Sequence, residues 1–150
     1  MILQCRDWKR NGRRIVLVSG HFALLHPGHI RLLEQARSHG DILVVALASD
    51  AAPGSPEILQ SLAPLAERAE ILAALAAVDF VTDFAGSSAD LLIAKLSPEV
   101  VVAGAANSFC APPGQGIASP KSGGPLFVRL PLEPGYSTEL LLERIAQLPA

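Results

Sequence analysis

The chain has 150 residues, of which 50% are hydrophobic and 17% are charged, and it carries a formal net charge of -2. This composition excludes a disordered chain and predicts a single domain, residues 1-150, with an apolar core to bury. The charged fraction lies well below the roughly 25% of average proteins. Because 12 Lys and Arg residues face 14 acidic ones, no surplus of positive charge is left for a phosphate backbone, and nucleic acid is excluded as a partner.

The cysteines and the apolar runs indicate a cytoplasmic protein. Cys5 and Cys110 lie far apart and lack the CxxC spacing, which favours reduced thiols over a disulfide framework. No apolar run of the sequence approaches the roughly 20 residues that a membrane-spanning helix needs. We therefore expect a chain without a disulfide that does not bind membranes.

Buried strands and amphipathic helices alternate in the first third of the chain. Residues 14–20 form a β-branched apolar run that ends in glycine, which predicts a buried parallel strand leading into a tight turn. Residues 28–38 place apolar side chains near helical spacing, and residues 42–49 form a second apolar run. The order strand, helix, strand predicts a βαβ unit.

The same alternation continues to the end of the chain. The predicted elements are a helix over 64–78, a strand over 79–84, a helix over 89–96, strands over 99–103 and 126–130, and a helix over 136–148. Residues 104–124 are rich in Ala, Gly, Pro and Ser, and a connection of this length is typical of a loop over a functional site. The pattern predicts an α/β fold with a five-stranded, mainly parallel sheet that helices cover on both faces.

The densest chemical signal is the segment from Gly20 to His29, which joins the first predicted strand to the first predicted helix. In an open parallel sheet, ligands bind beyond the carboxyl ends of the strands, where a helix N-terminus offers free backbone N–H groups. His26 and His29 flank a Pro-Gly turn there, and both imidazoles can donate to one anion while Gly28 leaves room for it. The segment therefore predicts a phosphate site.

Four blocks of sequence carry a family resemblance: HPGH at 26–29, Ser49-Asp50 after the second strand, PLAERAEILAAL at 64–75 and PGYST at 134–138. With them the chain resembles the HxGH-motif nucleotidyltransferases of the cytidylyltransferase-like family, and most closely the nucleotidyltransferase domain of ADP-heptose synthases. The resemblance covers the chain from Arg13 onward. It implies a Rossmann-like α/β/α sandwich.

The resemblance also implies a reaction. AMP from ATP, or CMP from CTP, would be transferred to a sugar phosphate or a similar phosphorylated acceptor, with release of pyrophosphate and use of Mg²⁺. An acceptor phosphate is already an anionic nucleophile at neutral pH, so the reaction needs alignment and charge stabilisation rather than a general base or a covalent intermediate. A homodimer is expected from the resemblance alone.

Roles for individual residues follow from the same resemblance. His26 and His29 would be catalytic and would stabilise charge on the α-phosphate and the pyrophosphate. Arg68 would contact the β- and γ-phosphates, and Ser137 and Thr138 would add donors to the triphosphate. The nucleotide-binding set is completed by Gly20, His21, Phe22, Gly28, Gly104 and Tyr136, with residues 103–107 bordering the base and ribose. The acceptor is assigned to Asp50 and Lys121.

Several charged residues of the family pattern are replaced in this chain. Ala23 stands where the family has an Asp before HxGH, and residues 51–62 contain neither Lys nor Arg where the family supplies lysine. At the end of the fourth predicted strand and just beyond it, Ala103 and Ala106 stand where the family has lysine and aspartate. Each lost charge-assisted phosphate contact removes about 1.5–3 kcal/mol. The alternative function is therefore a catalytically degenerate nucleotide-binding or interaction module on the same scaffold.

A zinc site at His21, His26 and His29 is a further alternative for the histidines. Zinc sites in proteins draw on Cys and His ligands from several parts of a fold, and no Cys lies near these three histidines in the sequence. We therefore predict no metal site in the protein itself and interpret His26 and His29 as phosphate-binding groups.

Overall fold

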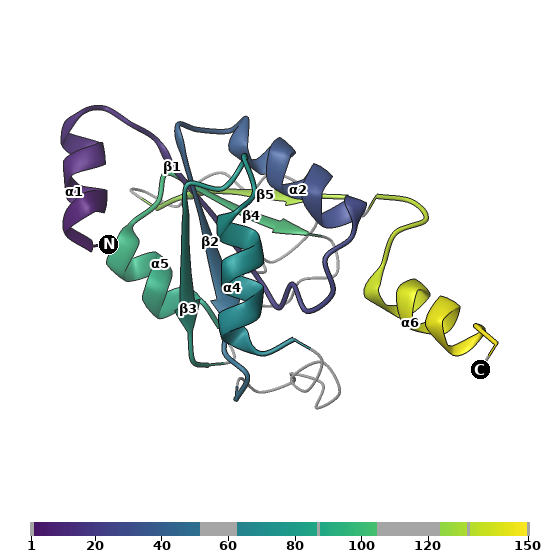
Figure 1. Cartoon of the computed structure of the whole chain (residues 1–150). Coiled ribbons are helices and arrows are strands. Elements are labelled where there is room, and N and C mark those ends of the chain that lie inside the picture. The colour runs from purple at the N-terminus through teal and green to yellow at the C-terminus, as the bar shows by residue number, and fades with distance from the viewer. Residues whose placement is uncertain (1, 52–62, 87, 105–123, 132, 150) are drawn as a thin grey trace.

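Five parallel strands form one sheet at the centre of the computed structural model, which describes residues 2–51, 63–86, 88–104, 124–131 and 133–149 (Figure 1). The strand order is β3-β2-β1-β4-β5, and every neighbouring pair is parallel. The strands are β1 (Ile15–Gly20), β2 (Ile42–Ala48), β3 (Phe80–Phe84), β4 (Val100–Gly104) and β5 (Leu126–Leu130). Each differs from its predicted range by at most one residue at either end.

Helices cover both faces of this sheet. Helices α2 (Pro27–Arg37) and α4 (Leu65–Ala73) supply Leu33, Ala36 and Leu72 to one apolar cluster. Helices α1 (Ile2–Arg10) and α5 (Asp90–Leu96) contribute to a second cluster on the other face and contact each other. The architecture is the predicted α/β fold, a Rossmann-like α/β/α sandwich, which confirms the fold class.

The burial of β1 and β2 on both faces explains why the sequence shows continuous apolar runs there instead of alternating apolar and polar residues. Every residue of β1 and β2 is buried, with Ile15 and Leu17 in the cluster under α1 and α5, and Val16 and Val18 in the cluster under α2. Successive side chains of a strand point to opposite faces, so a strand that is covered on both sides needs apolar residues at every position.

Helix α1 was not predicted from the sequence. Trp8 packs against Phe80 of β3 with ring centroids 4.6 Å apart, and Cys5, three residues earlier on the same helix face, is 3% exposed. Lys9 donates a hydrogen bond to the carbonyl of Ser97 and pairs with Glu99 at 3.4 Å. One buried and one partly buried side chain are too weak a periodic signal to predict a helix. The residues that α1 packs against are all distant in sequence.

Two predicted helices are shorter than expected. The helix expected over 64–78 ends at Ala73, because the chain then turns so that Val78 is buried and Asp79 accepts a hydrogen bond from the backbone N–H of Leu43. The helix expected over 136–148 is α6 (Thr138–Ala146), which begins after its N-cap Ser137. Helix α6 projects from the body in Figure 1, and none of its described residues is buried.

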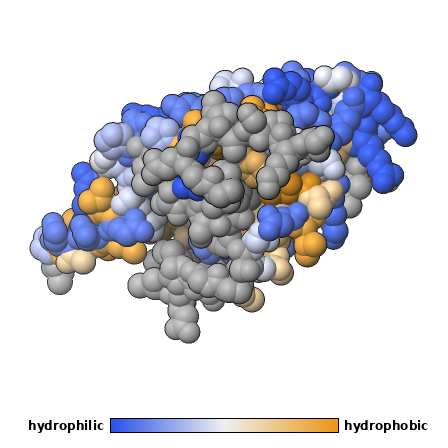
Figure 2. Space-filling view, turned by 180° about the vertical axis from the view of Figure 1, so that it is seen from behind, coloured by the Kyte–Doolittle hydropathy of each residue, from blue (hydrophilic) through white to orange (hydrophobic). Residues whose placement is uncertain are grey.

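The surface carries apolar side chains in scattered places. In Figure 2, hydrophilic surface predominates among the coloured residues, and the apolar surface is broken into separate areas. The large apolar side chains that are exposed come from four different helices: Leu3, Ile71, Leu91, Leu140 and Ile145, with Leu148 just beyond α6. Within the described ranges, no helix is long and apolar enough to cross a membrane.

Candidate nucleotide site

A cavity of about 160 Å³ lies where the N-terminal ends of α2 and α6 meet the carboxyl end of β4. It is lined by His26, Gly28, His29, Leu32, Gly104, Pro131, Glu133, Tyr136, Ser137, Thr138 and Glu139. Seven of these are predicted site residues that come from three separate stretches of sequence. The carboxyl edge of the sheet is where open α/β folds bind ligands, because helix N-termini point there.

The N-terminus of α2 forms one wall of this cavity. Pro27 is at the start of the helix and has no backbone N–H, and no side chain caps the helix. The carbonyl of His26 accepts hydrogen bonds from the backbone N–H groups of His29 at 2.9 Å and Ile30 at 3.4 Å. The uncapped end leaves a partial positive charge at the cavity, which favours an anion.

His26 and His29 form a stacked pair in this wall. Their ring centroids are 3.8 Å apart with an interplanar angle of 22°. The Nδ1 atoms of both rings are buried and make no hydrogen bond within the described residues. A Cβ atom at Gly28 would lie 3.0 Å from the His26 ring and from Tyr136 Cβ, so glycine is what allows the loop, the imidazole and the C-terminal segment to approach one another.

Both histidines of the pair are neutral at pH 7. Burial, together with the neighbouring His26, lowers the pKa of His29 to about 4, against the opposing effect of a hydrogen bond with the Leu24 backbone. Burial also lowers the pKa of His26, against the opposing effect of the Glu139 carboxylate. Neutral imidazoles offer N–H donors without a formal charge, so a bound anion would raise both pKa values.

The segment before α6 is held against α2 by Arg31, a residue that sequence reasoning missed. The Arg31 guanidinium pairs with Glu133 and lies 5.2 Å from the centroid of the Tyr136 ring. The Tyr136 ring is nearly parallel to the His26 ring, with centroids 6.4 Å apart. Only the fold brings residues 31, 133 and 136 together, and nothing in the local sequence of Arg31 indicates this contact.

Ser137 caps α6 at the cavity. Its Oγ accepts a hydrogen bond from the backbone N–H of Leu140 at 3.1 Å. The hydroxyl hydrogen remains able to donate to a ligand, because a hydroxyl both accepts and donates. Two helix N-termini, those of α2 and α6, therefore meet at one cavity, which reinforces its preference for an anion. Glu139 in the first turn of α6 brings the opposite charge to the same cavity.

Arg68 lies away from this cavity. Its side chain is 5% exposed, and its Nε donates to the carbonyl of Ala63 at 2.9 Å. Nη1 donates to the carbonyls of His21 at 2.6 Å and Ala48 at 3.2 Å, and Nη2 donates to Ala48 and pairs with Asp50. These five hydrogen bonds equal the donor capacity of a guanidinium. The expected contact with the β- and γ-phosphates stays a prediction that requires these bonds to break.

Asp50 is engaged in the same cluster. Its Oδ2 accepts from the backbone N–H of Leu65 at 3.0 Å, at the start of α4. This hydrogen bond and the Arg68 guanidinium lower the pKa of Asp50, so the carboxylate is ionised. The expected acceptor role of Asp50 therefore competes with a structural one. Lys121, the other residue assigned to the acceptor, lies outside the described residues, as do positions 105–107.

Gly20 ends β1, His21 and Phe22 follow it directly, and none of the three lines the cavity. The Phe22 ring is 6% exposed and lies 5.1 Å from the His29 ring at an angle of 52°. Burial lowers the pKa of His21, and the Arg68 guanidinium adds to the effect. In the described part of the chain, no three His, Cys, Asp or Glu side chains cluster in a way that could hold a metal ion.

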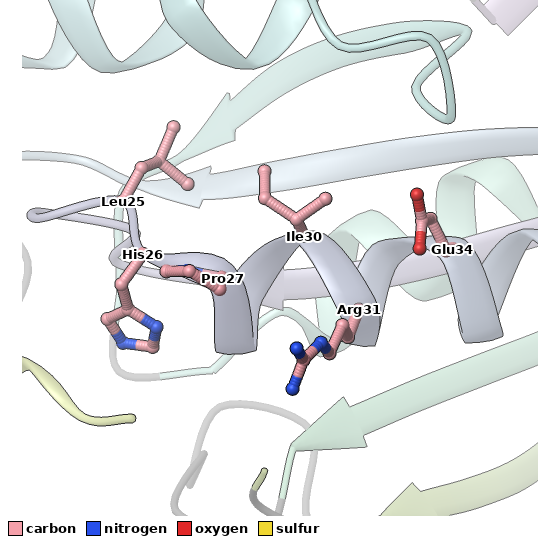
Figure 3. A pocket seen from close by; sticks show the side chains of 6 residues that line it. All are labelled: Leu25, His26, Pro27, Ile30, Arg31 and Glu34. Carbon is pink, nitrogen blue, oxygen red and sulfur yellow. The ribbon is translucent and has the colours of Figure 1, made fainter. Parts of the chain in front are cut away.

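A second hollow, of about 450 Å³, lies on the outer side of α2 (Figure 3). Figure 3 shows that Leu25, Ile30 and Glu34 point to one side of the helix while His26 and Arg31 point to the other. The polar groups therefore do not converge on one point, as specific ligand sites require. The cavity between α2 and α6 is the better candidate.

Fold and cavity together define a doubly wound α/β domain with a cavity at the carboxyl edge of its sheet whose surroundings favour an anion. Residues 17–116 match the family model described as cytidylyltransferase-like. Two proteins called bifunctional protein HldE are similar in sequence: that of Koribacter versatilis is 41% identical over 91% of this chain, and that of Hyphomonas neptunium is 39% identical over 96%. The chain therefore belongs to the cytidylyltransferase-like family of nucleotidyltransferases.

The chain spans less than a third of the length of these relatives, 28% of the Koribacter protein and 29% of the Hyphomonas protein. A lipopolysaccharide core biosynthesis protein from Thermoplasma volcanium superposes with a TM-score of 0.56 at 24% identity, over 65% of this chain and 80% of that one. This likeness supports the fold alone.

Proposed function

We propose that the chain transfers a nucleoside monophosphate from ATP, or from CTP, to the phosphate of a sugar phosphate or a similar small acceptor. An acceptor oxygen would form a bond to the α-phosphorus, the bond from that phosphorus to the bridging oxygen would break, and pyrophosphate would leave. The observation that carries the proposal is the meeting of the histidine pair with two helix N-termini in one cavity. All three elements donate hydrogen bonds to anions.

The cavity suits the phosphates better than the whole nucleotide. Its volume of about 160 Å³ is below the range of about 300–1,000 Å³ of pockets that enclose whole ligands. In this proposal His26 and His29 donate to the non-bridging oxygens on which charge builds in the transition state. Ser137 and Thr138 donate to the phosphates that leave, and Gly104 borders the nucleoside.

Mg²⁺ would enter with the triphosphate. This ion prefers oxygen ligands and is usually held by substrate phosphates and one or two carboxylates, where it neutralises phosphate charge. Of the two glutamates that line the cavity, Glu133 pairs with Arg31, so we assign Glu139 to the ion. One carboxylate is too few to hold Mg²⁺ alone, so the phosphates of the substrate would supply the other ligands.

The second candidate is a nucleotide-binding module without turnover. Among the described residues that line the cavity there is no Lys or Arg, and Arg68, which lies away from it, is occupied by internal acceptors. Neutral donors bind a phosphate more weakly than charged ones, because charge-assisted hydrogen bonds are about twice as strong. Binding without catalysis would fit such a cavity.

Pyrophosphate release separates the two candidates. The protein is incubated with ATP or CTP, Mg²⁺ and a panel of sugar 1-phosphates, and His29→Ala is compared with His39→Ala, which removes the same side chain outside the cavity. Catalysis predicts release that His29→Ala abolishes and His39→Ala retains. Thermal stabilisation by ATP or CTP without any release would support the binding module, and the absence of both would refute the site.

A further inference from the structure

Phe22 has an unfavourable backbone for its side chain. Its φ is 49°, and among the described residues other than glycine only Ser97 shares this left-handed conformation. Bulky residues rarely adopt it, and where they do, the surrounding structure holds them there, often beside a functional site. The conformation therefore requires an explanation in what it positions.

The left-handed turn folds the Phe22 ring back over the end of β1. A Cβ atom at residue 20 would lie 2.9 Å from Phe22 Cε2, so only glycine leaves room for the ring in this place. The ring belongs to the apolar cluster beneath α2, which includes Val18, Leu33 and Val102. Phe22 is thus fixed to the core on one side, and its other neighbour is the imidazole of His29.

The orientation of His29 depends on packing. Histidines with a chemical role are usually oriented by a hydrogen bond to one ring nitrogen. The His29 ring has one hydrogen bond with the backbone of Leu24, but its Nδ1 has no partner within the described residues, and the ring contacts Phe22 and His26. Because His26 is itself at the cavity surface, Phe22 is the ring contact that links the pair to the apolar cluster under α2.

On the basis of the proposed function, we propose that Phe22 is a positioning residue whose buried ring holds the imidazole of His29 toward the phosphate cavity and keeps water from its inner side. Phe22 acts through His29 and does not touch the substrate. The left-handed backbone of Phe22 and the absence of a side chain at Gly20 both serve to place this ring. Replacing the flat ring, while keeping an apolar side chain, frees the imidazole and admits water.

The test titrates the histidines by NMR in the ligand-free protein, so it does not depend on catalysis. Phe22→Leu is expected to raise the pKa of His29 from about 4 by about one unit or more toward the ordinary 6.5, because hydration favours the charged ring. Phe22→Tyr keeps a flat ring and is expected to preserve the low pKa. Glu139→Gln is included because this carboxylate is the charge that acts on His26.

Phe84→Leu is the matched control. Phe84 is a phenylalanine that is 8% exposed at the end of β3, in the cluster on the opposite face of the sheet. The same loss of packing there is expected to leave the pKa of His29 unchanged. An equal change in both variants, or no change in Phe22→Leu, would overturn the proposal.

Two further measurements test the role of Phe22 if Phe22→Leu does not fold. Gly20→Ala keeps the phenylalanine but displaces its ring, and it is expected to raise the pKa of His29 in the same direction. In the wild-type protein, nuclear Overhauser contacts between the rings of Phe22 and His29 are expected, and their absence would refute the placement of Phe22 beside His29.

If the wild type releases pyrophosphate, Phe22→Leu is expected to lower kcat by roughly tenfold to a hundredfold with little effect on KM. A wild type without turnover would refute the proposed function and leave the titration to decide on Phe22.

Discussion

Replacing Arg68 by methionine is expected to destabilise the fold more than any other single change of a charged residue in the described chain. The substitution keeps much of the side-chain volume and removes all five hydrogen bonds. It leaves the carbonyls of Ala48, Ala63 and His21 without this donor and leaves Asp50 without its cation. The Ala48 carbonyl belongs to a buried strand, where water does not replace the lost donor.

The expected loss is about 3–5 kcal/mol, because each buried carbonyl that loses its donor costs about 1–3 kcal/mol, whereas the pair with Asp50, whose side chain is 38% exposed, contributes little. This is a large share of the about 5–15 kcal/mol that stabilises a domain. Urea titrations followed by circular dichroism measure it through the midpoint and slope of unfolding. Arg37→Met is the matched control, because Arg37 forms one half-buried ion pair with Asp79 at 3.1 Å and one hydrogen bond to the carbonyl of Gly40 at 2.6 Å, and is expected to lose only about 1–2 kcal/mol from both.

Arg68→Lys distinguishes a structural Arg68 from one that binds the triphosphate. Lysine keeps the charge but lacks the planar five-donor fork, so most of the loss in stability is expected to persist. A loss in Arg68→Met no larger than that in Arg37→Met would refute the reasoning. A stable Arg68→Lys with a raised KM for the nucleotide would instead favour a direct phosphate contact.

Three other changes test the cavity. The pKa of His29 in the folded protein lies below its ordinary 6.5, so the unfolded chain binds more protons between about pH 4 and 6.5. The free energy of unfolding is therefore expected to fall as the pH decreases through this window. In urea titrations, His29→Asn is expected to lose the part of this pH dependence that comes from His29. Gly28→Ala is expected to weaken ATP binding at least tenfold in calorimetry, since its Cβ would lie 3.0 Å from His26 and Tyr136, whereas Gly86→Ala, with 3.7 Å to its nearest neighbour, should not. Ser137→Ala removes the N-cap of α6 and is expected to destabilise this helix by about 0.5–2 kcal/mol, which reduces the helical circular dichroism signal. The unfolding midpoint of the whole protein is expected to change little, because α6 has no buried residue.

For each of these three variants, one result would contradict the structural reasoning. An unchanged pH dependence in His29→Asn would place the proton uptake on another group. Equal ATP binding in Gly28→Ala and wild type would mean that the ligand does not need the close approach of the loop and the C-terminal segment. A large drop in the unfolding midpoint of Ser137→Ala would mean that α6 packs on the body of the protein in solution.

Much of the fold was predictable because it is encoded locally. A strand that is covered on both faces needs an uninterrupted apolar run, so β1 and β2 are visible in the sequence as such runs. The histidine segment was visible for the same reason: its turn residues and its position between a strand and a helix are neighbours in the chain. The strand order and the pairing of β1 with β4 join residues far apart, and no local pattern contains them.

The sequence by itself determined the strands, most of the helices, the fold class and the segment to which we assign the candidate site, because side-chain periodicity and turn chemistry act between near neighbours. Only the tertiary structure decided which residues share that site. It brought Glu133 and Tyr136 to Arg31, turned Arg68 toward internal carbonyls, and placed Phe22 behind His29. The physical reason is that hydrogen bonds, burial and pKa values depend on distances in space, which the chain acquires only when the sheet has assembled.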